Sequence, residues 1–126
     1  MTLRMKARAE LERGCEFELQ GDLVAAFRSF LKAARLRNVE AQVNVAVCYE
    51  YGKGCRKDFT KAVYWYQRAI RQRSPQAMYN FALYYRDRRK IHWAKFWLER
   101  AAAAGDQDAK KELSHLKLAI GGRESN

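Results

Sequence analysis

The sequence has few of the residues that interrupt regular structure or build covalent and metal frameworks. Its 126 residues include one proline, seven glycines and three cysteines, and the cysteines form no Cys-x-x-Cys pair. So few chain breakers exclude a loop-rich or collagen-like protein. Three cysteines cannot all be paired, and Cys15, Cys48 and Cys55 lie far from the two histidines in sequence, which argues against a disulfide framework and a clustered zinc site. We therefore expect reduced thiols, no metal and no cofactor.

Long hydrophobic runs are also missing. No stretch approaches the roughly 18 consecutive apolar residues of a membrane span, and the segment beginning at Met1 has no apolar core of the kind found in secretory signals. The apolar fraction of 48% nevertheless argues against disorder. A length of 126 residues is typical of one domain. The sequence therefore predicts a single folded cytoplasmic domain without a membrane span.

Positive charge is abundant, and it is unevenly placed. Residues 1–50 carry 8 basic and 7 acidic side chains, whereas residues 51–100 carry 13 basic and 3 acidic ones, a net charge of +10. A field of this sign attracts an acidic protein surface, nucleic acid or anionic lipid, and the alternative is a merely solvated helix face. The candidate basic face consists of Lys61, Arg68, Arg71, Arg73, Arg88 and Arg89.

Small residues recur at spacings of 32 and 36. One register contains Ala26, Ala62 and Ala94, and an aromatic residue or leucine follows each of them by four positions at Phe30, Tyr66 and Leu98. A second register, offset from the first, contains Ala9, Ala41, Ala77 and Ala109. Within each register the offsets are those of one helical face, and small residues there let two helices approach closely. Each unit is therefore predicted to be two antiparallel helices, A and B.

Capping residues support the same boundaries. Asn38, Ser74 and Asp106 precede the A helices and Asp58 precedes the second B helix, whereas Lys90 leaves the third B helix without a cap. We predict one repeat domain over residues 1–120, with units at about 5–37, 38–73 and 74–105, a capping helix at 106–120 and a flexible tail at 121–126.

The second unit resembles the Sel1-like repeat, whose pattern is A-x-x-N-L-G-x-x-Y-x-x-G-x-G-V-x-x-D-x-x-K-A-x-x-W-Y-x-x-A-A. The matching residues are Ala41, Asn44, Tyr49, Gly52, Gly54, Asp58, Lys61, Ala62, Trp65, Tyr66 and Ala69. The third unit, from Ala77 to Ala102, matches both ends of the pattern but lacks the Gly-x-Gly loop, and the first unit looks more like a tetratricopeptide repeat. Departures include Cys55 for valine and Arg73 where glycine often ends helix B. The resemblance implies a right-handed α-solenoid that serves as a scaffold for protein contacts and has no catalytic machinery.

The residues themselves also argue against an enzyme, because no phosphate loop, HExxH motif or nucleophile elbow is present. In paired-helix solenoids the A helices line the concave face. Projecting the repeat register predicts a groove there with an apolar floor and charged walls, formed by Leu11, Cys15, Val43, Val47, Tyr51, Tyr79, Leu83 and Arg86. Such a stripe suits an amphipathic helix, an extended peptide, the chain's own C-terminal helix or a second copy.

The sequence therefore predicts a non-enzymatic adaptor, including the inhibitory kind, that docks an acidic protein or peptide in this groove. Tyr51 and Tyr79 are the candidate hot spots, and Arg86 is the candidate charged anchor. Two alternatives stay open. One is nucleic-acid or anionic-surface binding through the basic convex face, which would depend steeply on salt. The other is a self-associating module that dimerises through the apolar groove.

Overall fold

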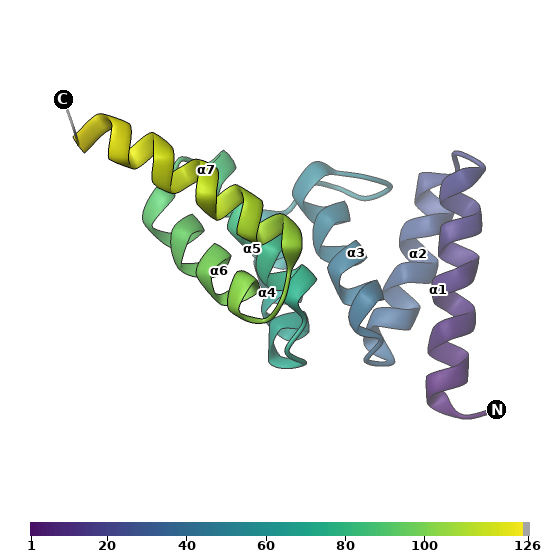
Figure 1. The fold of residues 1–126 in the computed structure, drawn as a ribbon. Helices are drawn as coiled ribbons and strands as arrows, with labels where there is room; N and C mark the ends of the chain where they lie inside the picture. The colour runs from purple at the N-terminus through teal and green to yellow at the C-terminus, as the bar shows by residue number, and fades with distance from the viewer. Residues whose placement is uncertain (125–126) are drawn as a thin grey trace. The chain divides into compact units, whose positions relative to one another are not determined.

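A computed structural model describes the backbone of residues 1–124 and the side chains of residues 1–118. This part of the chain contains seven α-helices and no β-strand (Figure 1). The helices are α1 (Leu3–Leu19), α2 (Leu23–Arg35), α3 (Val39–Tyr51), α4 (Phe59–Arg71), α5 (Pro75–Asp87), α6 (Ile91–Ala103) and α7 (Gln107–Glu124). The predicted fold class is confirmed: three helix pairs are followed by a terminal helix, as in helical-repeat solenoids.

Most helices begin at a residue whose side chain caps the first turn. In six of the seven, a side-chain oxygen accepts a hydrogen bond of 2.8–3.1 Å from the backbone N–H three residues later, the capping residues being Thr2, Asp22, Asn38, Asp58, Ser74 and Asp106. Such a bond satisfies one of the N–H groups that a helix start leaves unpaired. Helix α6 follows Lys90 and has no side-chain cap, as the sequence predicts.

The chain divides into two compact units. Unit 1 comprises residues 1–73 and contains α1 to α4, and unit 2 begins at Ser74 and contains α5 to α7. The boundary between Arg73 and Ser74 coincides with the predicted boundary between the second and third repeats. Each unit is described by itself below.

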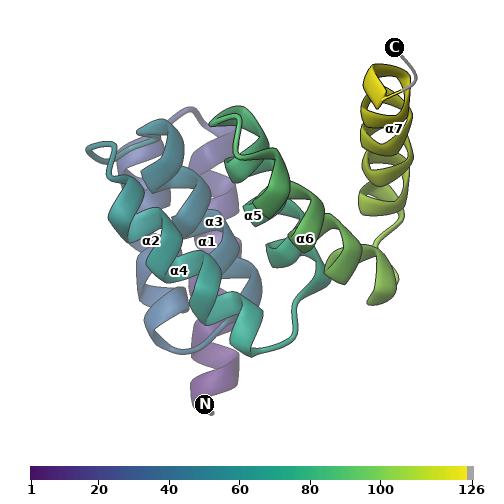
Figure 2. The same cartoon turned by 90° about the vertical axis from the view of Figure 1, so that its left-hand side faces the viewer.

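In unit 1 each helix packs against the next one along the chain, and Figure 2 shows α3 and α4 side by side. The centre is built from fully buried alanines and aromatic rings, with Phe30 and Tyr66 each 1% exposed. Gly14 explains the close approach of α1 to α2, because a Cβ at this position would lie 2.6 Å from the Phe30 ring. The small residues of the repeat therefore lie where the helices meet, as predicted.

The connection between α3 and α4 carries the four extra residues of the second repeat. Gly52 ends α3 in a left-handed conformation with φ +70°, and Gly54 has φ +73°. A Cβ at Gly54 would collide with the backbone carbonyl of Leu23 at the start of α2. Only glycine meets both demands, the positive φ and the close approach. The loop therefore rests directly on the preceding repeat.

In unit 2, α6 packs against both α5 and α7. Its core contains Ala82, Leu98, Ala101 and Ala109, flanked by Met78, Tyr79, Trp97, Ala102, Leu113 and Leu116. The predicted capping helix is present but longer than expected, because α7 continues to Glu124. The predicted tail at 121–126 is thus helical up to Glu124, and residues 125 and 126 lie outside the described residues. No helix in the described part of the chain is both long and apolar enough to cross a lipid bilayer.

Candidate protein-interaction surfaces

The predicted groove residues of unit 1 divide into buried and accessible ones. Leu11 and Val43 are 4% and 2% exposed, so they belong to the core rather than to an open surface. Val47 is half-buried, Cys15 is exposed, and Tyr51 is 57% exposed. The accessible part of this face therefore comprises Cys15, Val47 and Tyr51, on helices α1 and α3. Together with Leu19, which ends α1 at the repeat position of Tyr51, we call it the A face of unit 1.

The charge around the A face of unit 1 is negative. Partial burial raises the pKa of the Cys15 thiol, and the nearby carboxylates of Glu40, Glu18 and Glu12 raise it further. Lys53 compensates part of this charge, since its Nζ lies 3.5 Å from Glu18 Oε2. Like charges repel across an interface, so the A face of unit 1 is poorly suited to the acidic partner that the net charge predicts.

In unit 2 the chain's own terminal helix occupies the surroundings of the predicted groove residues. Tyr79 packs against the core that α5, α6 and α7 share, and Leu83 is half-buried. Burial raises the pKa of the Tyr79 hydroxyl, and Glu112 and Asp108 of α7 add to the effect. The candidate hot spot Tyr79 therefore lies beside α7.

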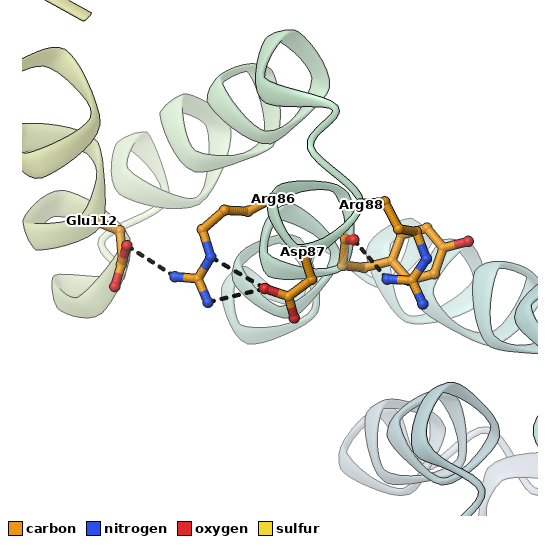
Figure 3. Close-up of polar contacts among 5 residues, drawn as sticks. Arg86, Asp87, Arg88 and Glu112 are labelled. Carbon is orange, nitrogen blue, oxygen red and sulfur yellow. Dashed lines mark hydrogen bonds and ion pairs between the residues drawn. The ribbon is translucent and has the colours of Figure 1, made fainter. Parts of the chain in front are cut away.

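Arg86, the candidate anchor for a partner's carboxylate, is engaged within unit 2. Its guanidinium donates to Glu112 Oε2 at 3.2 Å and to Asp87 Oδ1 at 3.3 and 3.4 Å (Figure 3). Two carboxylates already share this fork, which ties α5 to α7. A partner's carboxylate would have to displace them, so Arg86 is a weaker anchor than its sequence position suggests.

The six residues of the candidate basic face are divided between the two units. Lys61, Arg68, Arg71 and Arg73 belong to unit 1, and Arg88 and Arg89 belong to unit 2. Arg88 is half-buried: its guanidinium lies 3.7 Å from the centre of the Tyr84 ring and donates to the Tyr84 carbonyl at 2.8 Å (Figure 3). Arg68 donates to the Tyr64 hydroxyl at 2.9 Å and lies over the Trp65 ring at 5.3 Å.

Sequence reasoning missed a hollow in unit 1 that collects part of this positive charge. It has a volume of about 240 Å³ and is lined by Arg37, Gln42, Tyr64, Arg68, Arg71 and Gln72. Arg37 lies in the turn between α2 and α3, 36 residues before Arg73 and at the same repeat position. Both adopt a left-handed backbone, with φ 72° and 63°, where glycine is the usual residue. Arginine at this turn position in two successive repeats, where glycine is usual, is the sequence signal that could have indicated the hollow.

Cys48 and Cys55 lie in environments that disfavour the thiolate. Burial raises the pKa of the Cys48 thiol to about 11, and burial also raises the pKa of the Cys55 thiol. Because the thiolate is the reactive form, both are poor nucleophiles at neutral pH. Residues 1–118 contain no group of three or more His, Cys, Asp and Glu side chains placed to hold a metal ion.

The chain resembles known repeat proteins in sequence as well as in fold. The Sel1 repeat model matches residues 39–74 and 75–106, which together make up more than half of the chain. The chain belongs to the Sel1 repeat family. The resemblance drawn from the second and third units is thereby confirmed, with boundaries one residue later than predicted. Sel1 repeats generally mediate protein–protein interactions, and proteins built from them are typically non-enzymatic scaffolds.

Curated relatives match this chain over a small part of much longer sequences. Chitin synthase regulatory factor 3 of Schizosaccharomyces pombe is 30% identical over 75% of this chain and 11% of its own length. DAP3-binding cell death enhancer 1 of Rattus norvegicus is 46% identical over 40% of this chain and 10% of its own length. This chain therefore spans about a tenth of the length of these relatives.

Solved structures share the fold at low sequence identity. A Sel1 repeat protein from Oxalobacter formigenes matches with a TM-score of 0.74 and 23% identity, over 85% of this chain and 47% of that one. The N-terminal domain of stress-induced protein-1 from C. elegans matches with a TM-score of 0.71 and 21% identity, over 93% of this chain and 98% of that one. These likenesses show a helical-repeat fold.

Proposed function

We propose that this Sel1 repeat protein is a non-enzymatic interaction module that docks a protein or peptide partner on the A face of unit 1. The observation that carries the proposal is the exposed apolar surface there. Tyr51 is 57% exposed and Leu19, at the same repeat position one unit earlier, is 89% exposed. Large apolar side chains that recur on one face and remain in water are characteristic of interaction sites.

The charge on this face suggests which part of a partner it contacts. The carboxylates of Glu12, Glu18 and Glu40 surround Cys15, so they favour a neutral or basic segment of the partner. The acidic segment predicted from the overall charge belongs elsewhere on unit 1. Helix α4 and the residues after it supply that positive surface, because no aspartate or glutamate occurs between Asp58 and Asp87.

The proposal is tested by capture of a partner from the native cell, with identification by mass spectrometry and comparison of variants. Tyr51→Ala and Val47→Asp change the A face, and Val24→Asp is the matched control because Val24 is exposed on α2. We expect Tyr51→Ala and Val47→Asp each to weaken binding of that partner by about 30-fold or more, the loss typical of an interfacial hot spot. The control should bind like the unchanged protein.

Circular dichroism separates loss of contact from loss of fold. Tyr51 lies mostly in water, so Tyr51→Ala should retain the helical signal even if Val47→Asp does not. A partner that binds Tyr51→Ala and Val47→Asp as well as it binds the unchanged protein would refute docking on this face.

A further inference from the structure

One end of unit 1 carries two adjoining hollows. The first is the hollow of about 240 Å³ lined by Arg37, Gln42, Tyr64, Arg68, Arg71 and Gln72. The second, of about 340 Å³, includes Arg4 from the start of α1 together with Arg37 and Gln72. The two hollows share Arg37 and Gln72 in their lining, and we call the pair the arginine hollow.

The floor of the arginine hollow is held by a network of amide hydrogen bonds. Gln42 is 1% exposed, and its Nε2 donates to the Ala34 carbonyl at 3.2 Å. Gln72 Nε2 donates to Gln42 Oε1 at 3.0 Å and to the Arg37 carbonyl at 3.1 Å. These bonds link the end of α2, the first turn of α3 and the end of α4. They hold the backbone of Arg37 and the glutamine floor in place, although they do not fix the arginine side chains.

The positive charge in the arginine hollow is not neutralised by the protein. Arg4, Arg37, Arg68 and Arg71 line it, and no acidic side chain does. None of the four forms an ion pair with any residue in the described part of the chain. Arg68 donates only to the neutral hydroxyl of Tyr64. Three guanidinium groups line the first hollow and two line the second, with Arg37 common to both, and an anion bound among them would relieve the repulsion between like charges.

The backbone conformation of Arg37 provides a matched control for the charge argument. Its φ of 72° lies in the left-handed region, where a residue with a side chain is strained and glycine is not. The same conformation recurs at Arg73 and Arg89, so it is a property of the turns and does not itself indicate a ligand. Arg73 has the same strain, with φ 63°, but does not line either hollow. It is therefore a natural control.

We propose that the arginine hollow binds the side-chain carboxylates of an extended acidic segment of a protein partner. This rests on the proposed function, since it assumes a protein ligand, but it uses a different surface from the A face. Guanidinium forks grip carboxylates through two parallel hydrogen bonds, and arginines from two helices and a turn can hold successive carboxylates.

Single-stranded nucleic acid fits the arginine hollow less well. Its bases need open aromatic faces on which to stack. Tyr64 is the aromatic residue that lines the hollow, and Arg68 lies over its ring at 5.7 Å while Trp65 meets it edge to face at 5.2 Å. The ring is thus already in contact with two protein neighbours.

The test measures binding of fluorescein-labelled hexaglutamate to the full chain by fluorescence anisotropy. The hollow variant is Arg37→Gly with Arg71→Gln, and the matched variant is Arg73→Gly with Arg56→Gln. Both remove two charges and one strained left-handed arginine, and Arg56 is exposed in the α3–α4 loop. We expect the hollow variant to weaken binding by about tenfold or more, and the matched variant by about twofold or less.

A structural role for the same arginines predicts a different result. Cations near the carboxyl ends of α2 and α4 stabilise those helices. If the hollow variant melts at a lower temperature but binds hexaglutamate like the matched variant, the arginines are structural and the proposal is wrong. Equal weakening by both variants would mean attraction to net charge alone and would overturn the proposal as well.

Companion probes separate the ligand classes and the two proposals. Hexaglutamine, which has no carboxylates, should not bind. If a phosphoserine peptide or oligothymidylate binds more tightly than hexaglutamate through the same arginines, the ligand is a phosphopeptide or a nucleic acid, and the carboxylate proposal is wrong. Tyr51→Ala should leave hexaglutamate binding unchanged, because Tyr51 does not line the arginine hollow. If the hollow does not bind hexaglutamate, the proposal of docking on the A face is unaffected. If Tyr51→Ala does not weaken partner binding, the proposal for the hollow is likewise unaffected.

Discussion

The second and third helix pairs belong to the same repeat family, yet their connections differ. Seven residues join α3 to α4, and three join α5 to α6. The longer connection turns on Gly52 and Gly54 and delivers Asp58 as the cap of α4. The shorter one turns on Arg89, with φ 60°, and leaves α6 uncapped after Lys90. The repeat therefore keeps its helix packing while its turn chemistry changes.

The two repeats are also stabilised by different neighbours. The loop of the second repeat rests on α2, through the close approach of Gly54 to the Leu23 carbonyl. The third repeat is held at its other side by α7, through the Arg86–Glu112 ion pair and the packing of Ala109. A repeat can thus gain stability either from its loop or from its end cap.

The largest expected effect is that of Gly54→Ala. The new Cβ would collide with the Leu23 backbone, and the alanine would have to adopt an unfavourable positive φ. We therefore expect the free energy of unfolding to fall by about 3 kcal/mol. Gly21→Ala is the control, since Gly21 has φ +82° but nothing near its Cβ position, and it should cost about 1 kcal/mol. Urea unfolding measures both. Equal losses would show that the loop does not depend on its contact with α2.

A smaller effect should follow from overpacking the shared register. Ala62 and Ala94 hold the same repeat position in α4 and α6, and both are fully buried. We expect Ala62→Leu and Ala94→Leu each to lower the free energy of unfolding by about 1–3 kcal/mol, because the larger side chain forces the paired helices apart. Ala103→Leu, on an exposed site of α6, should be nearly neutral. Sensitivity at one of the two buried positions alone would contradict the equivalence of the repeats.

Much of the fold could be predicted because its signals are local. The caps Asn38, Asp58 and Ser74 each act within three residues of themselves, and the uncapped start after Lys90 was identified for the same reason. The alanine registers report helix contacts that recur at a constant spacing. The two-unit division was not predicted, because the repeat pattern continues across the boundary at Arg73 without a change.

The candidate sites are harder to predict from the sequence than the helices, because they depend on contacts between residues far apart in the chain. A helical projection says which way Leu11 and Val43 point, but not that neighbouring helices bury them. The engagement of Arg86 depends on Glu112, which lies 26 residues later. The arginine hollow depends on hydrogen bonds from Gln72 to Arg37 and Gln42, across 35 and 30 residues. Summing charge over residues 51–100 also merged two separate units.

The smallest expected effect concerns the missing cap of the third repeat. Lys90 has φ −89° and ψ 67°, close to the −87° and 82° of Asp22, whose side chain accepts from the Ala25 N–H at 3.1 Å. An aspartate in this backbone conformation would reach the Trp93 N–H in the same way. We expect Lys90→Asp to raise the free energy of unfolding by about 1 kcal/mol, through the new hydrogen bond and through removal of a cation from the positive end of α6.

The reverse change in the second repeat, Asp58→Ala, should lower the free energy of unfolding by about 1 kcal/mol, because it removes the bond to the Lys61 N–H. Lys90→Ala separates the two contributions to the gain at α6, since it removes the cation without supplying an acceptor. Thermal and urea unfolding of the three variants measure these differences. If Lys90→Asp is no more stable than Lys90→Ala, the backbone before α6 does not present the capping geometry that it shares with Asp22, and the contrast between the two repeats has another cause.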